Sequence, residues 1–335
     1  MANYTWVISG PQTRELTQAA GRRLDFLVDG AASARFTISG RSEEALAVVE
    51  FESDLTVYRD SEKIFRGRVV SSQDAVTESG HTTTFLAKDY RGLLEYRNVG
   101  PSGLTWTGVD QGVIAWELID HTQSKVSGSL GITNGLGATS GQVRTRAIAP
   151  GTNIGSSLTS LGHLQGGFEW EIDEQLAFNR YYSRRGVNNG VQLDYGGALS
   201  TLNRSQTPDF ANVAQVVGSN VTTATEVSAA SLATDTRGRW EIAKAYPTVT
   251  EQATVDARAA WLLGETATAR PGYSAKMTQG RWEGRNQMWL GDTVGLKIKS
   301  GRLSESSDQR LVTLGIDVSD EGSETVYLGL INATT

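Results

Sequence analysis

The chain has 335 residues, enough for about two domains, and its 31 Lys and Arg residues stand against 37 Asp and Glu residues, a net charge of −6. This acidic balance disfavours a protein that holds DNA or RNA by neutralising phosphates. The chain has no cysteine, which excludes disulfides, thiolate metal sites and cysteine nucleophiles. Its apolar runs reach about five residues against the roughly 18 needed to cross a bilayer, and its first residues lack a signal-peptide pattern, so we expect a soluble globular protein.

The first hundred residues predict short antiparallel strands. Alternating β-branched and aromatic residues bounded by turn formers occur at 55–59, 63–70 and 82–86. A short helix is predicted over Tyr90–Leu94, with Asp89 as its N-cap. We therefore expect an N-terminal β-barrel domain over residues 1–105.

The middle of the chain predicts helices mixed with strands. Asp110 is expected to cap one helix and Thr152 or Asn153 a second. Apolar residues lie on one face of each predicted helix, namely Ile114, Ala115, Leu118 and Ile119, then Ile154, Leu158 and Leu161. Polar residues and glycines over 123–141 predict an exposed loop, and Phe168–Asp173 alternates as a half-buried strand. We expect a mixed α/β region over 106–245.

The last part predicts one helix followed by strands. A capping box at Thr248–Glu251 begins the helix, whose buried stripe is Val255, Ala259, Leu262 and Leu263. Alternating apolar residues then predict strands at 294–298, 312–318 and 326–330. We expect a helix and a C-terminal β-barrel domain over 246–335. The predicted fold is mainly β, with two small antiparallel β-barrel domains flanking an α+β middle.

Two stretches of sequence resemble each other. Residues 74–86 and 317–329 align without a gap, and each begins with Asp, turns at an acidic, Gly and Ser cluster, and returns through Thr and an aromatic residue. Many antiparallel hairpins share this composition, so both an unrelated pair of hairpins and a duplicated β domain stay open. If the domain is duplicated, three copies of the chain would present six similar modules.

A search for catalytic or ligand-binding clusters gives few candidates. The three histidines, His81, His121 and His163, are too far apart to form a local metal site. The glycines at Gly135–Gly141 lack the preceding strand and following helix that a dinucleotide site requires. We therefore expect no catalytic, cofactor-binding or metal-binding residues and no cofactor.

Acidic and aromatic residues leave two hypotheses open. Glu169, Glu171 and Asp173 share one face of a predicted strand, with Glu174 beside them. Alternate residues on a strand are about 7 Å apart, which permits a glycosidase pair, but the solvated face of an edge strand looks the same and is favoured. Among eight tryptophans, Trp282 has the most exposed setting and is a candidate interface anchor.

The order of these elements resembles the tail-hub proteins of long-tailed bacteriophages, also called baseplate-hub or minor tail proteins, with phages of actinobacteria the nearest association. The resemblance covers nearly the whole chain. The segments that carry it are Leu55–Asp60, Ile64–Val69, Ala87–Leu94, Phe168–Asp173 and Gly291–Val294.

This resemblance implies a homotrimer in which each subunit contributes two related β-barrels to a quasi-sixfold ring. The ring would join the tail tube, distal tail protein and tape measure protein to tip or fibre proteins, and would surround the DNA channel. It implies no enzyme activity, no sequence-specific nucleic-acid binding, no membrane insertion, and a place at the tail tip after synthesis in the host cytoplasm. The alternatives are a receptor-recognition protein that binds cell-wall carbohydrate and a tail-associated glycosidase using Glu169 or Glu171.

Overall fold

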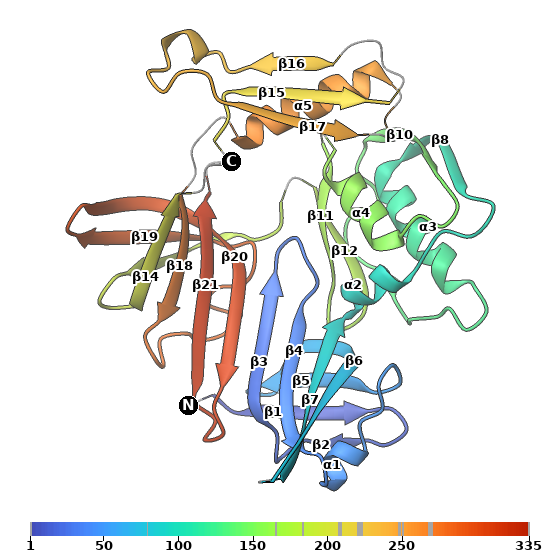
Figure 1. Ribbon diagram of the computed structural model, residues 1–335, viewed down its shortest axis with the longest axis vertical. Helices are drawn as coiled ribbons and strands as arrows, with labels where there is room; N and C mark the ends of the chain where they lie inside the picture. Colours follow the sequence, from blue (N-terminus) through green and yellow to red (C-terminus); the bar gives the residue numbers. More distant parts are fainter. Residues whose placement is uncertain are drawn as a thin grey trace.

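The computed structural model describes residues 2–78, 80–164, 166–182, 184–206, 210–219, 224–246, 249, 251–266 and 271–333. Figure 1 shows a large curved sheet built from both ends of the chain, a helical middle region beside it, and a smaller α/β layer above the two. The architecture is mainly β, as the sequence predicts.

The N-terminal part of the sheet contains most of the expected strands. Its elements are β1 (Tyr4–Ser9), β2 (Arg14–Glu15), β3 (Ala20–Leu27), β4 (Ser33–Ser39), α1 (Glu43–Leu46), β5 (Asp54–Arg59), β6 (Glu62–Thr77), β7 (Gly80–Asp89), α2 (Tyr90–Leu93) and the 3₁₀ turn η1 (Leu94–Tyr96). Leu55 and Val57 face the core, as their alternation predicts. Asp89 caps α2 as expected, because its carboxylate accepts the Gly92 N–H at 2.8 Å.

The C-terminal strands belong to the same sheet. They are β13 (Asn188–Asp194), β14 (Leu199–Gln206), β18 (Pro271–Met277), β19 (Thr293–Ser300), β20 (Leu303–Val318) and β21 (Glu324–Asn332). Pairing of β20 with β3 joins the two parts into one 13-stranded sheet. The expectation of two closed barrels is therefore not confirmed, since none of the sheets formed by the described strands closes. Alternation shows which side chains face the core, but not which strand edges meet.

The two parts of the sheet nevertheless have the same strand order. One reads β3-β4-β7-β6-β5-β1, and the other reads β14-β18-β21-β20-β19-β13. The long strands β6 and β20 both contain 16 residues. Each also shifts register against its hairpin partner, at Val69/Ser71 and at Leu311/Thr313. One difference is that β1 lies antiparallel to β5, whereas β13 lies parallel to β19.

The two similar sequence stretches are the hairpins β6–β7 and β20–β21. Thr77 pairs with Gly80 across a two-residue turn, whereas the Ser319 N–H donates to the Ser323 carbonyl across a three-residue turn that contains Gly322 at φ 82°. The ungapped alignment therefore matches the returning strands but is one residue out of register on the outgoing strands. In the structure Ala75 of β6, and not Asp74, occupies the position that corresponds to Asp317 of β20.

The middle region forms a second core beside the sheet. It contains β8 (Leu104–Asp110), α3 (Gln111–Gln123), β9 (Thr133–Asn134), β10 (Val143–Ile148), α4 (Ile154–Gly162), β11 (Phe168–Ile172) and β12 (Ala177–Tyr182). Asp110 and Asn153 cap α3 and α4, as expected. The expected exposed loop over 123–141 is partly wrong, because Leu130 and Ile132 are buried and β9 pairs with β12.

A third, smaller core lies in the upper layer. This layer consists of β15 (Val213–Gly218), β16 (Thr225–Ser228), the 3₁₀ turn η2 (Leu232–Thr234), β17 (Glu241–Tyr246) and α5 (Gln252–Thr266). Val255, Ala259 and Leu262 are buried on α5, as the stripe predicts. Of the expected capping box, Thr248 and Thr250 lie outside the described residues. In the part of the chain that the structure describes, no helix is long and apolar enough to span a membrane.

Candidate functional site

The acidic side chains of strand β11 contact arginines and are only partly exposed to solvent. Glu171 pairs with Arg185 and accepts the Tyr181 hydroxyl at 2.6 Å. Glu169 pairs with Arg310 of β20 and also accepts the Arg185 N–H at 3.0 Å. Both arginine side chains are 7% exposed, so burial makes the carboxylates their necessary partners. β11 is an edge strand, as the favoured interpretation expects, but its acidic face is half-buried against these arginines and not fully solvated.

The carboxylates that follow on the chain are also engaged. Glu174 pairs with Arg285, and burial raises the pKa of Glu174 despite that pairing. Asp173 accepts the Gln175 and Ala177 N–H groups and thereby closes the β11–β12 turn. A glycosidase needs one carboxyl group as acid and another as base or nucleophile, and here each of the four side chains holds a structural partner.

We call the pairs of Glu169, Glu171 and Glu174 with Arg310, Arg185 and Arg285 the acidic seam. Arg310 comes from β20, and Arg285 belongs to the loop between β18 and β19, so these pairs join the middle region to the C-terminal sheet. The Arg285 guanidinium also stacks on Trp289 at 4.1 Å. The seam fixes the position of β11 and offers no free acid or base.

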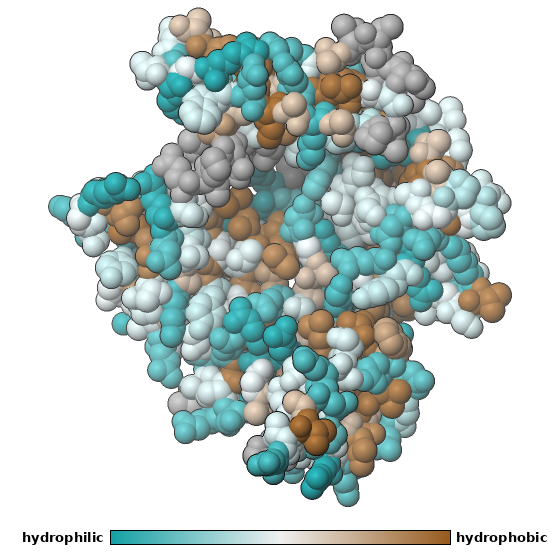
Figure 2. Space-filling model, in the orientation of Figure 1, coloured by the Kyte–Doolittle hydropathy of each residue, from teal (hydrophilic) through white to brown (hydrophobic). Residues whose placement is uncertain are grey.

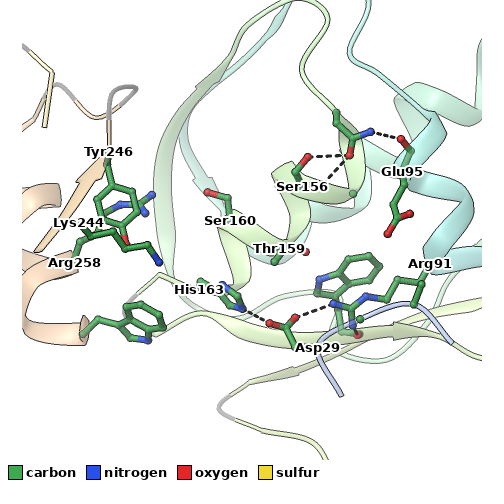
Figure 3. A pocket seen from close by; sticks show the side chains of 16 residues that line it. Asp29, Arg91, Glu95, Ser156, Thr159, Ser160, His163, Lys244, Tyr246 and Arg258 are labelled. Atoms are coloured by element: carbon green, nitrogen blue, oxygen red, sulfur yellow. Dashed lines mark hydrogen bonds and ion pairs between the residues drawn. The ribbon is translucent and has the colours of Figure 1, made fainter. Parts of the chain in front are cut away.

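A polar cavity of about 550 Å³ lies between α4 and the upper layer. In its floor Asp29 accepts hydrogen bonds from Arg91 and His163, both at 2.8 Å, as Figure 3 shows. The hydrogen bond to His163 is the main cause that lowers the pKa of Asp29 to about 2. Arg91 is buried and stacks on Trp170 at 4.2 Å, so this network pins the β3–β4 loop to β11.

The opposite wall of the cavity is basic. Lys244, Tyr246 and Arg258 face the α4 side across the opening (Figure 3), and the Arg258 guanidinium lies 4.1 Å over the Tyr246 ring. Among the described residues His163 bonds to Asp29 and to no serine or threonine hydroxyl, so a serine–histidine pair is not assembled here.

A larger hollow adjoins this cavity. Figure 2 shows it beneath the upper layer, with apolar atoms along its wall. Its volume is about 1000 Å³, and it shares Asp29, His163 and Trp261 with the polar cavity. Its apolar lining comes from the sheet and from α5, as Leu27, Val28, Val312, Ile331, Ala257 and Ala260. The hollow separates layers of the fold, and its carboxylates Asp29 and Glu169 are the ones already paired with Arg91 and Arg310.

The other histidines have structural roles. His81 bonds to Asp74 at 2.9 Å within the β6–β7 hairpin. His121 lies near the end of α3, as expected, and accepts the Gly100 N–H at 3.1 Å. Burial lowers the pKa of His121. The residues that the structure describes contain no group of side chains suited to hold a metal ion.

Trp282 is buried, which overturns its expected role as an exposed interface anchor. Only 3% of it is exposed. Its ring stacks on Trp289 at 6.4 Å, and the Arg59 guanidinium covers it at 4.6 Å. The exposed tryptophan is Trp240, at 52%, and its sequence setting shows no distinctive signal.

Comparison with known proteins finds similar folds among solved structures. Neither a family model nor a curated protein matches the sequence. The 43 kDa tail protein of prophage MuSo2 from Shewanella oneidensis is 13% identical, with a TM-score of 0.74, and the match covers 98% of both chains. The tail protein from Neisseria meningitidis MC58 is 12% identical, with a TM-score of 0.68, over 99% of this chain and 97% of that chain.

A third structure extends the likeness to a secretion system. The Escherichia coli c3393 protein, a type VI secretion component described as similar to T4 bacteriophage tail proteins gp27 and gp5, is 9% identical, with a TM-score of 0.59. The match covers 98% of this chain and 77% of that chain. At these identities the likeness is one of fold. The chain has the fold of bacteriophage tail proteins, which confirms at that level the resemblance found in the sequence.

Proposed function

We propose that this chain is a structural protein of a bacteriophage tail tip, a tail hub without enzyme activity. The observation that carries the proposal is the repeated strand order in the two parts of the sheet. A fold that matches tail proteins over nearly the full length of both chains supports it. Two related modules per subunit would let a threefold assembly meet a sixfold one.

In this role three copies form a ring of six modules around the DNA channel. The ring joins the tail tube, the distal tail protein and the tape measure protein to tip or fibre proteins. The first module lies in the end region 1–105. The second combines the strands of the end region 246–335 with β13 and β14 from the region 106–245. Duplication of an ancestral β domain accounts for the shared strand order and for the similar 16-residue strands.

The proposed location is the tail tip of the virion, after synthesis in the host cytoplasm. The net charge of −6 is compatible with a channel that lets DNA pass without gripping its phosphates. The proposal includes neither sequence-specific nucleic-acid binding nor membrane insertion. The arginine pairs of the acidic seam argue against the glycosidase alternative, and burial of Trp282 argues against a sugar-binding role at that residue.

Light scattering of the purified chain tests the assembly. The expected mass is three times that of one chain, and averaged electron micrographs should show threefold symmetry. A chain that stays monomeric at high concentration and fails to join purified tail tubes would contradict the proposal. In zymography on host cell walls we expect no lysis, and lysis that disappears in Glu171→Gln would favour the glycosidase.

A further inference from the structure

One strand edge already joins two similar modules inside the chain. The first half of β20, Leu303–Arg310, pairs with β19. Beyond it, on the same edge, Thr313–Val318 pairs antiparallel with Arg22–Leu27 of β3. The other edge of this second half is occupied by β21. This β20–β3 joint links the C-terminal part of the sheet to the N-terminal part.

The corresponding edge of β6 has no strand on it among the described residues. β5 pairs with Glu62–Arg68, and β7 covers the opposite edge as far as Thr77. Ser71–Thr77 is exposed at every residue. The counterpart of β3 is β14, which pairs with β18 alone among the described strands and lies at the end of the sheet. In the described part of the chain, no strand pairs with this edge of β6 at residues 71–76 or with the outer edge of β14 at residues 202–206, and these two edges correspond to the two sides of the internal joint.

We propose that these edges pair between copies, so that residues 72–76 of one chain lie antiparallel to residues 202–206 of the next. The internal joint sets the register. Ser71 corresponds to Thr313, because each follows the register shift of its long strand. Asn203 corresponds to Arg23 through their neighbours across the sheet. Asp317 pairs with Arg23, so its counterpart Ala75 lies opposite Asn203.

The side chains in this register are complementary. Asp74 lies opposite Arg204, which gives a pair of opposite charges, and Val76 lies opposite Leu202, which gives an apolar pair. Directly opposed pairs of these kinds stabilise antiparallel strands. Val76 is 74% exposed in the single chain, so pairing removes an apolar side chain from water.

The backbone of β6 is also oriented for this pairing. Because Thr77 and Gly80 close a two-residue hairpin, the N–H groups of Ser72, Asp74 and Val76 point to the free edge. Ser72, Asp74 and Val76 of β6 lie on the face that corresponds to Leu314, Ile316 and Val318 of β20. A free edge needs polar residues to avoid indiscriminate aggregation, whereas the internal joint is covered once the chain folds.

The arrangement is head-to-tail, because the two edges differ. Head-to-tail contacts form a ring when the rotation closes and a filament when it does not. That the ring closes after three copies rests on the proposed hub function. The pairing of the two edges can be tested separately.

The chain has no cysteine, so a disulfide can report the pairing directly. The Val28 N–H donates to the Val312 carbonyl, which places Arg23–Asp317, and hence Asn203–Ala75, at non-hydrogen-bonded positions where side chains lie closest. Oxidation of Ala75→Cys/Asn203→Cys at high protein concentration should give covalent dimers and trimers on a non-reducing gel, which reductant reverts to single chains.

Two double variants serve as matched controls. Arg23→Cys/Asp317→Cys should form a disulfide within each chain, so the oxidised product should still run as a single chain on the non-reducing gel. Val76→Cys/Asn203→Cys shifts the register by one residue and places the two thiols on opposite faces. It should give at least ten-fold less cross-linked product than Ala75→Cys/Asn203→Cys.

The outcomes separate the edge pairing from the hub function. If Ala75→Cys/Asn203→Cys stays uncrosslinked while the intrachain control closes, the edge pairing is wrong, even if light scattering finds three chains. If the crosslink forms but the product is an open-ended series instead of a closed trimer, the edge pairing stands and the threefold ring is wrong. Equal crosslinking in the register control would also overturn the pairing.

Discussion

Arg59 connects the two ends of the chain and offers a quantitative test of the fold. Its guanidinium donates to both oxygens of Glu324 on β21, at 3.0 and 2.9 Å, and to the Trp282 carbonyl at 3.2 Å. Tyr4 donates to the same carboxylate at 2.7 Å. The Arg59 and Glu324 side chains are each 9% exposed, so Arg59→Met would leave a carboxylate buried without its cation.

Removing one partner of a buried ion pair costs about 3–5 kcal/mol. With a urea m-value of roughly 3 kcal/mol per M, Arg59→Met should lower the unfolding midpoint by about 1 M or more. Arg59→Met/Glu324→Met should recover most of that loss, because no charge stays buried. Urea unfolding followed by tryptophan fluorescence measures both.

The matched control for Arg59→Met is Arg14→Met. The Arg14–Glu43 pair is also a direct contact, at 2.8 Å, but its side chains are 37% and 83% exposed. Exposed pairs contribute about 0–1 kcal/mol. If the free energies of unfolding of Arg59→Met and Arg14→Met differ by less than about 1 kcal/mol, Arg59 does not hold the two ends of the chain together.

Four further outcomes are expected. The lowered pKa of Asp29 (about 2 when folded against the ordinary 3.8) gives stability present above pH 4 and lost as pH falls towards 2, so Asp29→Asn should flatten that part of an acid-unfolding curve. Glu171→Gln should destabilise by about 3 kcal/mol in urea unfolding, since it leaves a buried arginine unpaired. Gly67→Ala should lower the melting temperature because its Cβ would overlap the Lys88 carbonyl. Val76→Pro should weaken self-association at least ten-fold in sedimentation, with unchanged circular dichroism, because its N–H faces the free edge.

Local elements were predictable because their signals are local. The caps at Asp89, Asp110 and Asn153 and the helix stripes depend on residues three or four positions apart. The alternation of β5 and β11 likewise identified the buried face of each strand. The similarity of the two hairpins was detectable because it lies in their local composition.

Long-range partners were not predictable from such patterns. Glu169 finds Arg310 across 141 positions, and no periodicity relates them. Trp282 looked exposed because glycine and charged residues surround it in sequence, yet Trp289 and Arg59 cover it in the fold. The strand edges escaped prediction for the same reason, since β3 pairs with Thr313–Val318 of β20, which lies far from it in the sequence.

The β20–β3 pairing also has a consequence for biosynthesis. β3 leaves the ribosome about 290 residues before its partner, Thr313–Val318. At about 5–20 residues per second, this edge of β3 stays without its β20 partner for roughly 15–60 s. During that interval nascent chains on one polysome hold open edges next to each other, and a chaperone that covers Ala20–Leu27 would raise the yield of correctly folded subunits. The order of translation thus leaves one edge of the first module unpaired until nearly the whole chain has been made.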